Sequence, residues 1–150
     1  MSIQEKIKEE IKNALRAKDS LRLSVMRSIS AAFTNELLNL KRKPTEELTD
    51  DEALAVIKKT AKQRRDSIEQ YQKGNREDLA EKETQELKII EEFLPEPLPY
   101  EKIKNIAQKK KDELNITDRS DIGRLIGVVI KETKDRASGQ TVKQAVEELF

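Results

Sequence analysis

A short proline-rich segment constrains the fold of this 150-residue chain more than any other feature. Residues 95–99 read Pro-Glu-Pro-Leu-Pro. Three prolines in five positions cannot continue a helix, and they favour an extended, semi-rigid connector. The segment therefore predicts a linker at 95–99 that joins an N-terminal domain at 1–94 to a C-terminal domain at 100–150.

Both parts are expected to be helical. The chain holds only four glycines and four prolines, too few for the many turns of an all-β protein. Apolar residues recur at spacings of three and four, the period of one helix face. The pattern predicts helices at about 3–18, 21–43, 49–74 and 76–94, and then at about 100–113, 119–133 and 140–149. The predicted fold class is all-α, with an N-terminal four-helix domain followed by a small C-terminal three-helix domain.

Several local signals refine these helices. Ser2 with Glu5 forms a capping-box pattern, and Asp19 and Thr49 are candidate N-caps of the next two helices. The pair at 74–75, Gly-Asn, predicts a left-handed end for the third helix. The stretch at 28–35 contains no charged side chain, so we expect it to be buried on most sides.

Residue types that are missing from the chain exclude several classes of chemistry. The absence of cysteine excludes disulfides, thiol catalysis and thiolate metal sites. The absence of histidine excludes histidine-based triads and histidine metal ligands. The four glycines form no phosphate loop, and the acidic residues form no EF-hand pattern. We therefore expect no catalytic residue, no cofactor and no metal site. A binding function is favoured over a catalytic one.

The N-terminus has no apolar signal region, and no stretch of the sequence approaches the length of a membrane span. These features predict a cytoplasmic protein that does not act at a membrane. The formal net charge is only +1, so a nucleic-acid site has to be a local patch of basic residues.

One basic cluster lies in the third expected helix and includes Lys58, Lys62 and Arg65. Arg64 stands where the apolar stripe of that helix predicts an apolar residue. Either Arg64 pairs with an acid between two helices, or the helices open there into a cationic groove. We favour the pairing, because long basic side chains reach outward readily and acids are plentiful.

A second basic cluster, Lys131, Lys134 and Arg136, lies at the end of the sixth expected helix. Cations stabilise a helix C-terminus, which is a purely structural explanation. The same cations stand beside the start of the next helix, whose free N–H groups favour anions, so a phosphate site is the alternative. The residue types leave both interpretations open.

Gly123 and Gly127 lie four apart inside the sixth expected helix. Each glycine costs a helix roughly 1 kcal/mol relative to alanine. We expect the backbone of another helix to approach closely there, and a groove for a partner is the alternative.

Residues 121–150, DIGRLIGVVIKETKDRASGQTVKQAVEELF, resemble the C-terminal tail module of the B subunit of the tRNA-dependent amidotransferase. Together with residues 23–27, Leu-Ser-Val-Met-Arg, and 93–95, Phe-Leu-Pro, the whole chain resembles the YqeY-like proteins that share this module. Two positions depart from the usual tail pattern. Asp135 replaces a common glycine and places a negative charge among the cations, and Ser138 replaces a common aspartate or asparagine.

The resemblance implies an accessory protein that binds tRNA or another structured RNA, with Lys131, Lys134 and Arg136 as phosphate contacts. It also implies an association with an amidotransferase or an aminoacyl-tRNA synthetase component. A protein-interaction adaptor is a second hypothesis. Carbon–nitrogen ligase activity with glutamine as the nitrogen donor, present only within a complex, is a third.

Overall fold

The computed structural model describes the backbone of all 150 residues and every side chain except that of Asp135. The described chain is helical and contains no strand, which confirms the predicted all-α class. It divides into two compact units, Met1–Leu94 and Pro95–Phe150. Among the described residues, no helix combines the length and the apolar character that crossing a bilayer requires.

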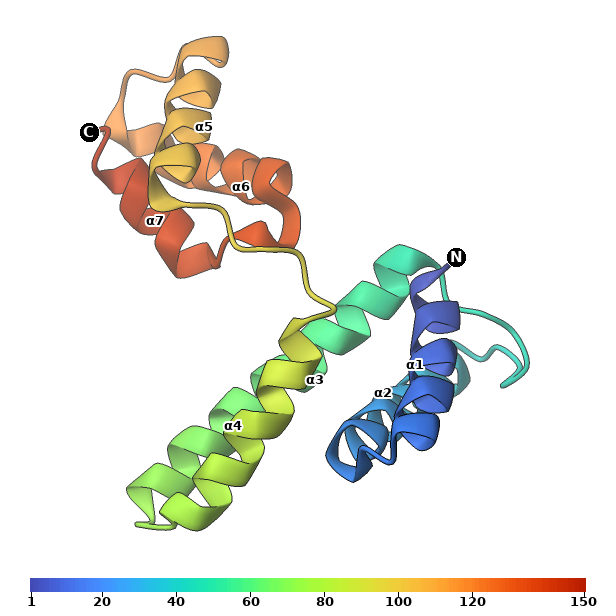
Figure 1. Ribbon diagram of the computed structural model, residues 1–150. Coiled ribbons are helices and arrows are strands. Elements are labelled where there is room, and N and C mark those ends of the chain that lie inside the picture. Colours follow the sequence, from blue (N-terminus) through green and yellow to red (C-terminus); the bar gives the residue numbers. More distant parts are fainter. The chain divides into compact units, whose positions relative to one another are not determined.

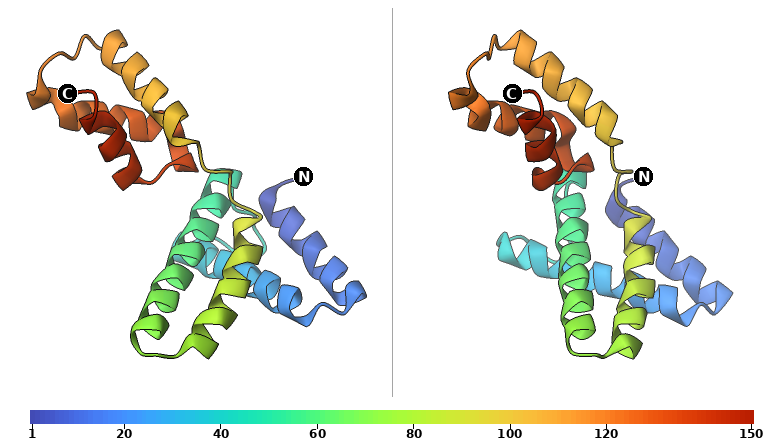
Figure 2. Two further views of the ribbon diagram at one scale, coloured as in Figure 1. Left: turned by 60° about the vertical axis from the view of Figure 1, so that its left-hand side comes forward. Right: turned by 90° about the vertical axis from the view of Figure 1, so that its left-hand side faces the viewer.

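The N-terminal unit is built from four helices. They are α1 (Ile3–Ala17), α2 (Ser20–Asn39), α3 (Asp50–Lys73) and α4 (Glu77–Glu91). Figure 1 shows α3 and α4 as a long antiparallel hairpin, and α1 and α2 as a second, shorter one. The helix α2 lies across the α3–α4 hairpin and contacts both of its members (Figure 2).

The helix α2 supplies the centre of the N-terminal core. Its inner face buries Met26, Ile29, Phe33 and Leu37 completely, together with residues from α1, α3 and α4. Each such side chain contributes about 1.5–3 kcal/mol through its removal from water. The outer face of α2 is exposed at residues 28, 31, 34 and 35. The prediction that the uncharged stretch is buried on most sides is therefore wrong, because serine, threonine, asparagine and alanine side chains can face solvent without carrying a charge.

Local signals set most helix starts as expected. Ser2 and Glu5 form a complete capping box, as does Thr49 with Glu52. The carboxylate of Asp19 accepts a hydrogen bond from a backbone N–H in the first turn of α2. At the end of α3 the left-handed residue is Asn75, with a φ of 57°, whereas the φ of Gly74 is −86°.

The C-terminal unit contains three α-helices and two short 3₁₀ turns. They are α5 (Tyr100–Glu113), η1 (Arg119–Asp121), α6 (Ile122–Thr133), η2 (Lys134–Arg136) and α7 (Gly139–Glu147). The three α-helices pack against one another in pairs. Their shared core consists of Ile103, Ala107, Ile116, Leu125, Val129, Val142, Ala145 and Val146. The packing leaves the opposite face of α6 in contact with solvent.

Candidate nucleic-acid interface

The three cations expected near the end of α6 lie on two successive elements. Lys131 occupies the last turn of α6, and Lys134 and Arg136 belong to η2. The chain turns at Lys134, whose φ of 50° lies in the left-handed region. All three side chains are exposed. The three cations therefore face solvent at the end of α6 and in the turn that follows it.

Lys131 and Lys134 form no ion pair with any described side chain. The neighbouring acid Glu132 is directed toward α5, where its carboxylate lies 3.8 Å from the Lys110 ammonium. Asp135, which was expected to weaken the site, has a side chain outside the described residues. Within the described set, the charges of Lys131 and Lys134 are not neutralised.

Arg136 has a structural role in this unit. Its Nε donates a hydrogen bond of 3.0 Å to the carbonyl oxygen of Glu96, and its own carbonyl accepts one of 2.8 Å from the Leu98 N–H. These bonds attach the proline-rich segment to η2. A guanidinium has five N–H donors, so one bond to a carbonyl leaves others for an anion.

The start of α7 is already partly capped. The Thr141 N–H donates to the Ser138 hydroxyl oxygen at 3.1 Å, and the two hydroxyl oxygens lie 2.7 Å apart. Ser138 therefore performs the capping that an aspartate or asparagine performs at many helix starts. The cap uses one of the backbone donors on which the expected phosphate site depended.

Other cations of the C-terminal unit contrast with Lys131 and Lys134. The Lys104 ammonium lies 3.0 Å from Glu148, and that of Lys110 lies 3.2 Å from Glu113. Hydrogen bonds to these carboxylates raise the pKa of both lysines above the usual value. Lys111 donates to the Leu149 carbonyl oxygen and lies 4.5 Å from the centroid of the C-terminal phenylalanine ring. These three lysines serve the packing of the unit.

Part of the basic cluster of α3 pairs with acidic residues of α4. Arg64 pairs with Glu83 at 3.0 Å and also with Glu86, both on α4, which confirms the pairing we favoured for this position. Arg65 lies 3.7 Å from Glu91. Of the other predicted site residues on α3, Lys62 is exposed and Lys58 is half-buried. The α3 cluster thus contributes in part to the contact between α3 and α4.

The glycine pair of α6 does not pack against another helix. Both glycines are exposed, and a Cβ built at either one has no heavy atom within 4 Å. The expected close approach of a neighbouring backbone is therefore wrong within the described chain. The sequence cannot separate the two cases, since a missing side chain suits a tight contact and an open surface equally well.

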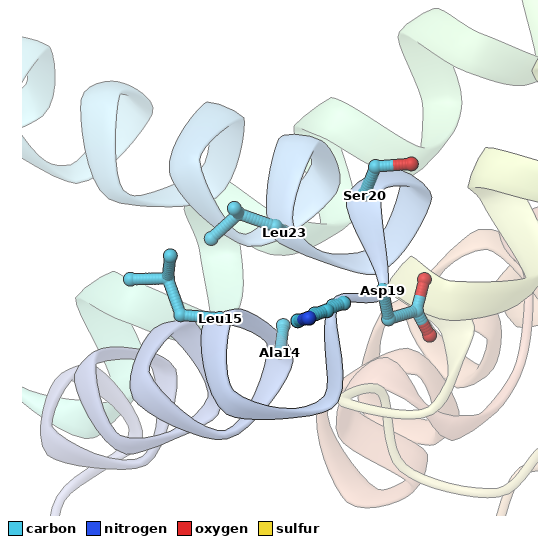
Figure 3. Close-up of a pocket in the computed structure, with 6 residues that line it drawn as sticks. Ala14, Leu15, Asp19, Ser20 and Leu23 are labelled. Atoms are coloured by element: carbon cyan, nitrogen blue, oxygen red, sulfur yellow. The ribbon is translucent and has the colours of Figure 1, made fainter.

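The structure also shows a shallow hollow of about 300 Å³ at the turn between α1 and α2 (Figure 3). Ala14, Leu15 and Leu23 provide its apolar wall, and Asp19 and Ser20 lie at its rim. The apolar repeat of a helix does not distinguish a leucine that is buried from one that lines an open hollow, so the sequence did not predict this feature. In the structure, Leu15 is 53% exposed.

A sequence profile of the YqeY-like protein family matches residues 4–150. The chain belongs to the YqeY-like family. Similar curated proteins include altered inheritance of mitochondria protein 41 from three yeasts. That of Vanderwaltozyma polyspora is 37% identical over 73% of this chain and 57% of its own length. That of Kluyveromyces lactis is 37% identical over 58% of this chain and 45% of its own, and that of Clavispora lusitaniae is 30% identical over 86% and 72%. The chain thus spans about half the length of the first two.

These relatives correct one expectation. Their names assign them to mitochondria, whereas the sequence features predict a cytoplasmic protein. The expectation depended on the lack of an apolar signal region. Mitochondrial targeting segments are amphipathic and rich in arginine and serine, so that criterion does not distinguish the two compartments.

Proposed function

We propose that this YqeY-like protein is an accessory RNA-binding protein whose C-terminal unit contacts the phosphate backbone of tRNA. The contacts are assigned to Lys131, Lys134 and Arg136. The observation that carries this proposal is that Lys131 and Lys134 are exposed and unpaired among the described residues beside the start of α7, whereas Lys104 and Lys110 of the same unit pair with carboxylates. Exposed unpaired cations gain most from a polyanion, because binding releases its condensed counterions.

The resemblance of residues 121–150 to an amidotransferase tail module supports tRNA as the RNA in question. It also supports an amidotransferase or aminoacyl-tRNA synthetase component as a protein partner in the same complex. Any carbon–nitrogen ligase activity would then belong to that complex. Lys58, Lys62 and Arg65 form a weaker secondary candidate surface, because acids of α4 lie beside part of the α3 cluster.

The test is tRNA binding by the full chain, followed by fluorescence anisotropy at several salt concentrations. We expect the Lys131→Ala/Lys134→Ala variant to bind at least tenfold more weakly at low salt. Its salt dependence should also be less steep, by roughly one for each lost phosphate contact. The matched control is Lys102→Ala/Lys109→Ala, which removes the same charge from exposed positions of α5. Equal affinity of the two double variants would refute the proposed site.

A protein-interaction adaptor is a second candidate, favoured by exposed leucines on the N-terminal unit. Leu15 and Leu38 are each 53% exposed. Recovery of a defined protein partner from nuclease-treated extract by the wild-type chain, and not by Leu15→Ser/Leu38→Ser, would support this function. Loss of all partners after nuclease treatment would exclude it.

A further inference from the structure

The cationic surface at the end of α6 continues toward the start of the helix. Arg124, Gly127 and Lys131 follow one another at spacings of three and four, and Gly123 lies four residues before Gly127. Such spacings place residues on one face of a helix. All four are exposed. We call these four residues the α6 strip.

The α6 strip carries two cations and no carboxylate. Like Lys131, Arg124 forms no ion pair with any described side chain. The nearest acids in the sequence are Asp121, which precedes α6 as its N-cap residue, and Glu132, which is directed toward Lys110 of α5. An anion that lies along the strip therefore meets one cation on each side of Gly127.

Beside its two glycines, the strip is bare helix backbone. Nothing in the described chain occupies the space beside Gly123 or Gly127, and neither glycine has a positive φ. The fold therefore requires glycine at neither position, although alanine is much better suited to a helix. A chain-like ligand can lie closer to the helix axis here than side chains would otherwise permit.

We infer that the α6 strip seats the sugar–phosphate backbone of base-paired RNA. Arg124 and Lys131 contact phosphates on either side of Gly127. The two cations lie seven positions apart in the sequence, which corresponds to about 10 Å along a helix axis. This inference depends on the proposed RNA-binding function and extends its site from the end of α6 along the helix.

The strip favours paired over unpaired RNA because it offers nothing on which bases can stack. Proteins that hold single strands use exposed aromatic side chains as stacking platforms. The aromatic residues of the C-terminal unit are Tyr100 and Phe150, and both are half-buried within its core. Double-stranded RNA is recognised mainly through its shape and its phosphates, which matches an aromatic-free basic face.

The test compares an RNA hairpin with an unstructured strand of the same length, using the full chain. The variants Gly127→Ala and Gly127→Gln place a small and a larger neutral obstacle in the strip without changing its charge. Thermal unfolding should show both to be at least as stable as wild type, because the added atoms meet no neighbour. We expect hairpin affinity to fall in the order wild type, alanine, glutamine, by about tenfold for the last.

The variant Arg124→Gln supplies the second measurement. The logarithm of the hairpin-binding constant falls linearly with the logarithm of the salt concentration, and we expect Arg124→Gln to reduce the steepness of this slope by about one, as the loss of one phosphate contact does. The control Lys109→Gln should leave the slope unchanged. A stable Gly127→Gln variant with wild-type affinity would overturn the inference, as would equally tight binding of the unpaired strand. If Lys131→Ala/Lys134→Ala weakens binding while the strip variants do not, only this extension fails. If the wild-type chain binds an acidic protein surface and no RNA, the proposed function fails as well.

Discussion

Arg64 shows how a basic residue inside an apolar stripe holds two helices together. Its guanidinium lies between α3 and α4, where it pairs with Glu83 and Glu86. The side chains of Arg64 and Glu86 are only 18% and 11% exposed. At such burial the charges depend on one another, because each has lost most of its hydration.

Replacement of Arg64 by alanine should lower the free energy of unfolding by about 2 kcal/mol, because Glu86 is left poorly hydrated without a counter-charge. Urea denaturation followed by circular dichroism measures this change. Lys59→Ala is the control, since Lys59 is an exposed residue of the same helix. A loss no larger than that of the control would show that the ion pair contributes nothing to stability.

Residue-level predictions succeeded where the sequence contained both partners of an interaction. The pairing of Arg64 followed from an interrupted stripe and a neighbouring helix rich in acids. The exposure of Gly123 and Gly127 did not follow from the sequence, because it depends on which faces of α6 the other helices cover. The assignment of Lys131, Lys134 and Arg136 to an RNA site stays a prediction.

At the scale of elements, the end of α2 differs most from expectation. The sequence predicted a helix up to Pro44, but α2 ends at Asn39. The Lys41 N–H donates to the Leu38 carbonyl and the Arg42 N–H donates to the Leu37 carbonyl, which is the hydrogen-bond pattern of a Schellman motif. Its left-handed residue is Lys41, with a φ of 58°. Glycine usually marks this position, so its absence concealed the end of the helix.

Replacement of Lys41 by glycine should therefore stabilise the N-terminal unit. A residue with a Cβ pays roughly 1 kcal/mol in the left-handed conformation, and glycine avoids most of this strain. Thermal unfolding is expected to show a higher midpoint for Lys41→Gly. The exposed neighbour Lys43 is the control, because substitution of glycine there offers no such relief. A midpoint below that of wild type would show that the side chain of Lys41 stabilises the turn.

The helix starts were predicted more accurately than the ends. Capping boxes at Ser2 and Thr49 have a polar residue and an acid at fixed spacing, so a short sequence window contains the whole interaction. Left-handed ends such as those at Lys41 and Asn75 are tolerated by several residue types. A sequence window therefore identifies them less reliably.

At the scale of the whole molecule, periodicity and the shortage of turn residues were sufficient to predict an all-helical protein. Those features depend on local interactions, since a helix that buries one face needs apolar residues at spacings of three and four, whichever element packs against that face. The cellular compartment and the ligand depend on partners outside the chain. Composition therefore gave no guide to the mitochondrial names of the relatives.

We propose that the exposed end of α6 in this YqeY-like chain contacts RNA. The most direct measurement is a titration of the isotopically labelled full chain with tRNA, followed residue by residue through its backbone amide resonances. We predict that the largest shifts occur at residues 123–136 and in the first turn of α7, and that they decline as salt is added. Shifts confined to the N-terminal unit, or no shifts at low salt, would refute RNA binding at the end of α6.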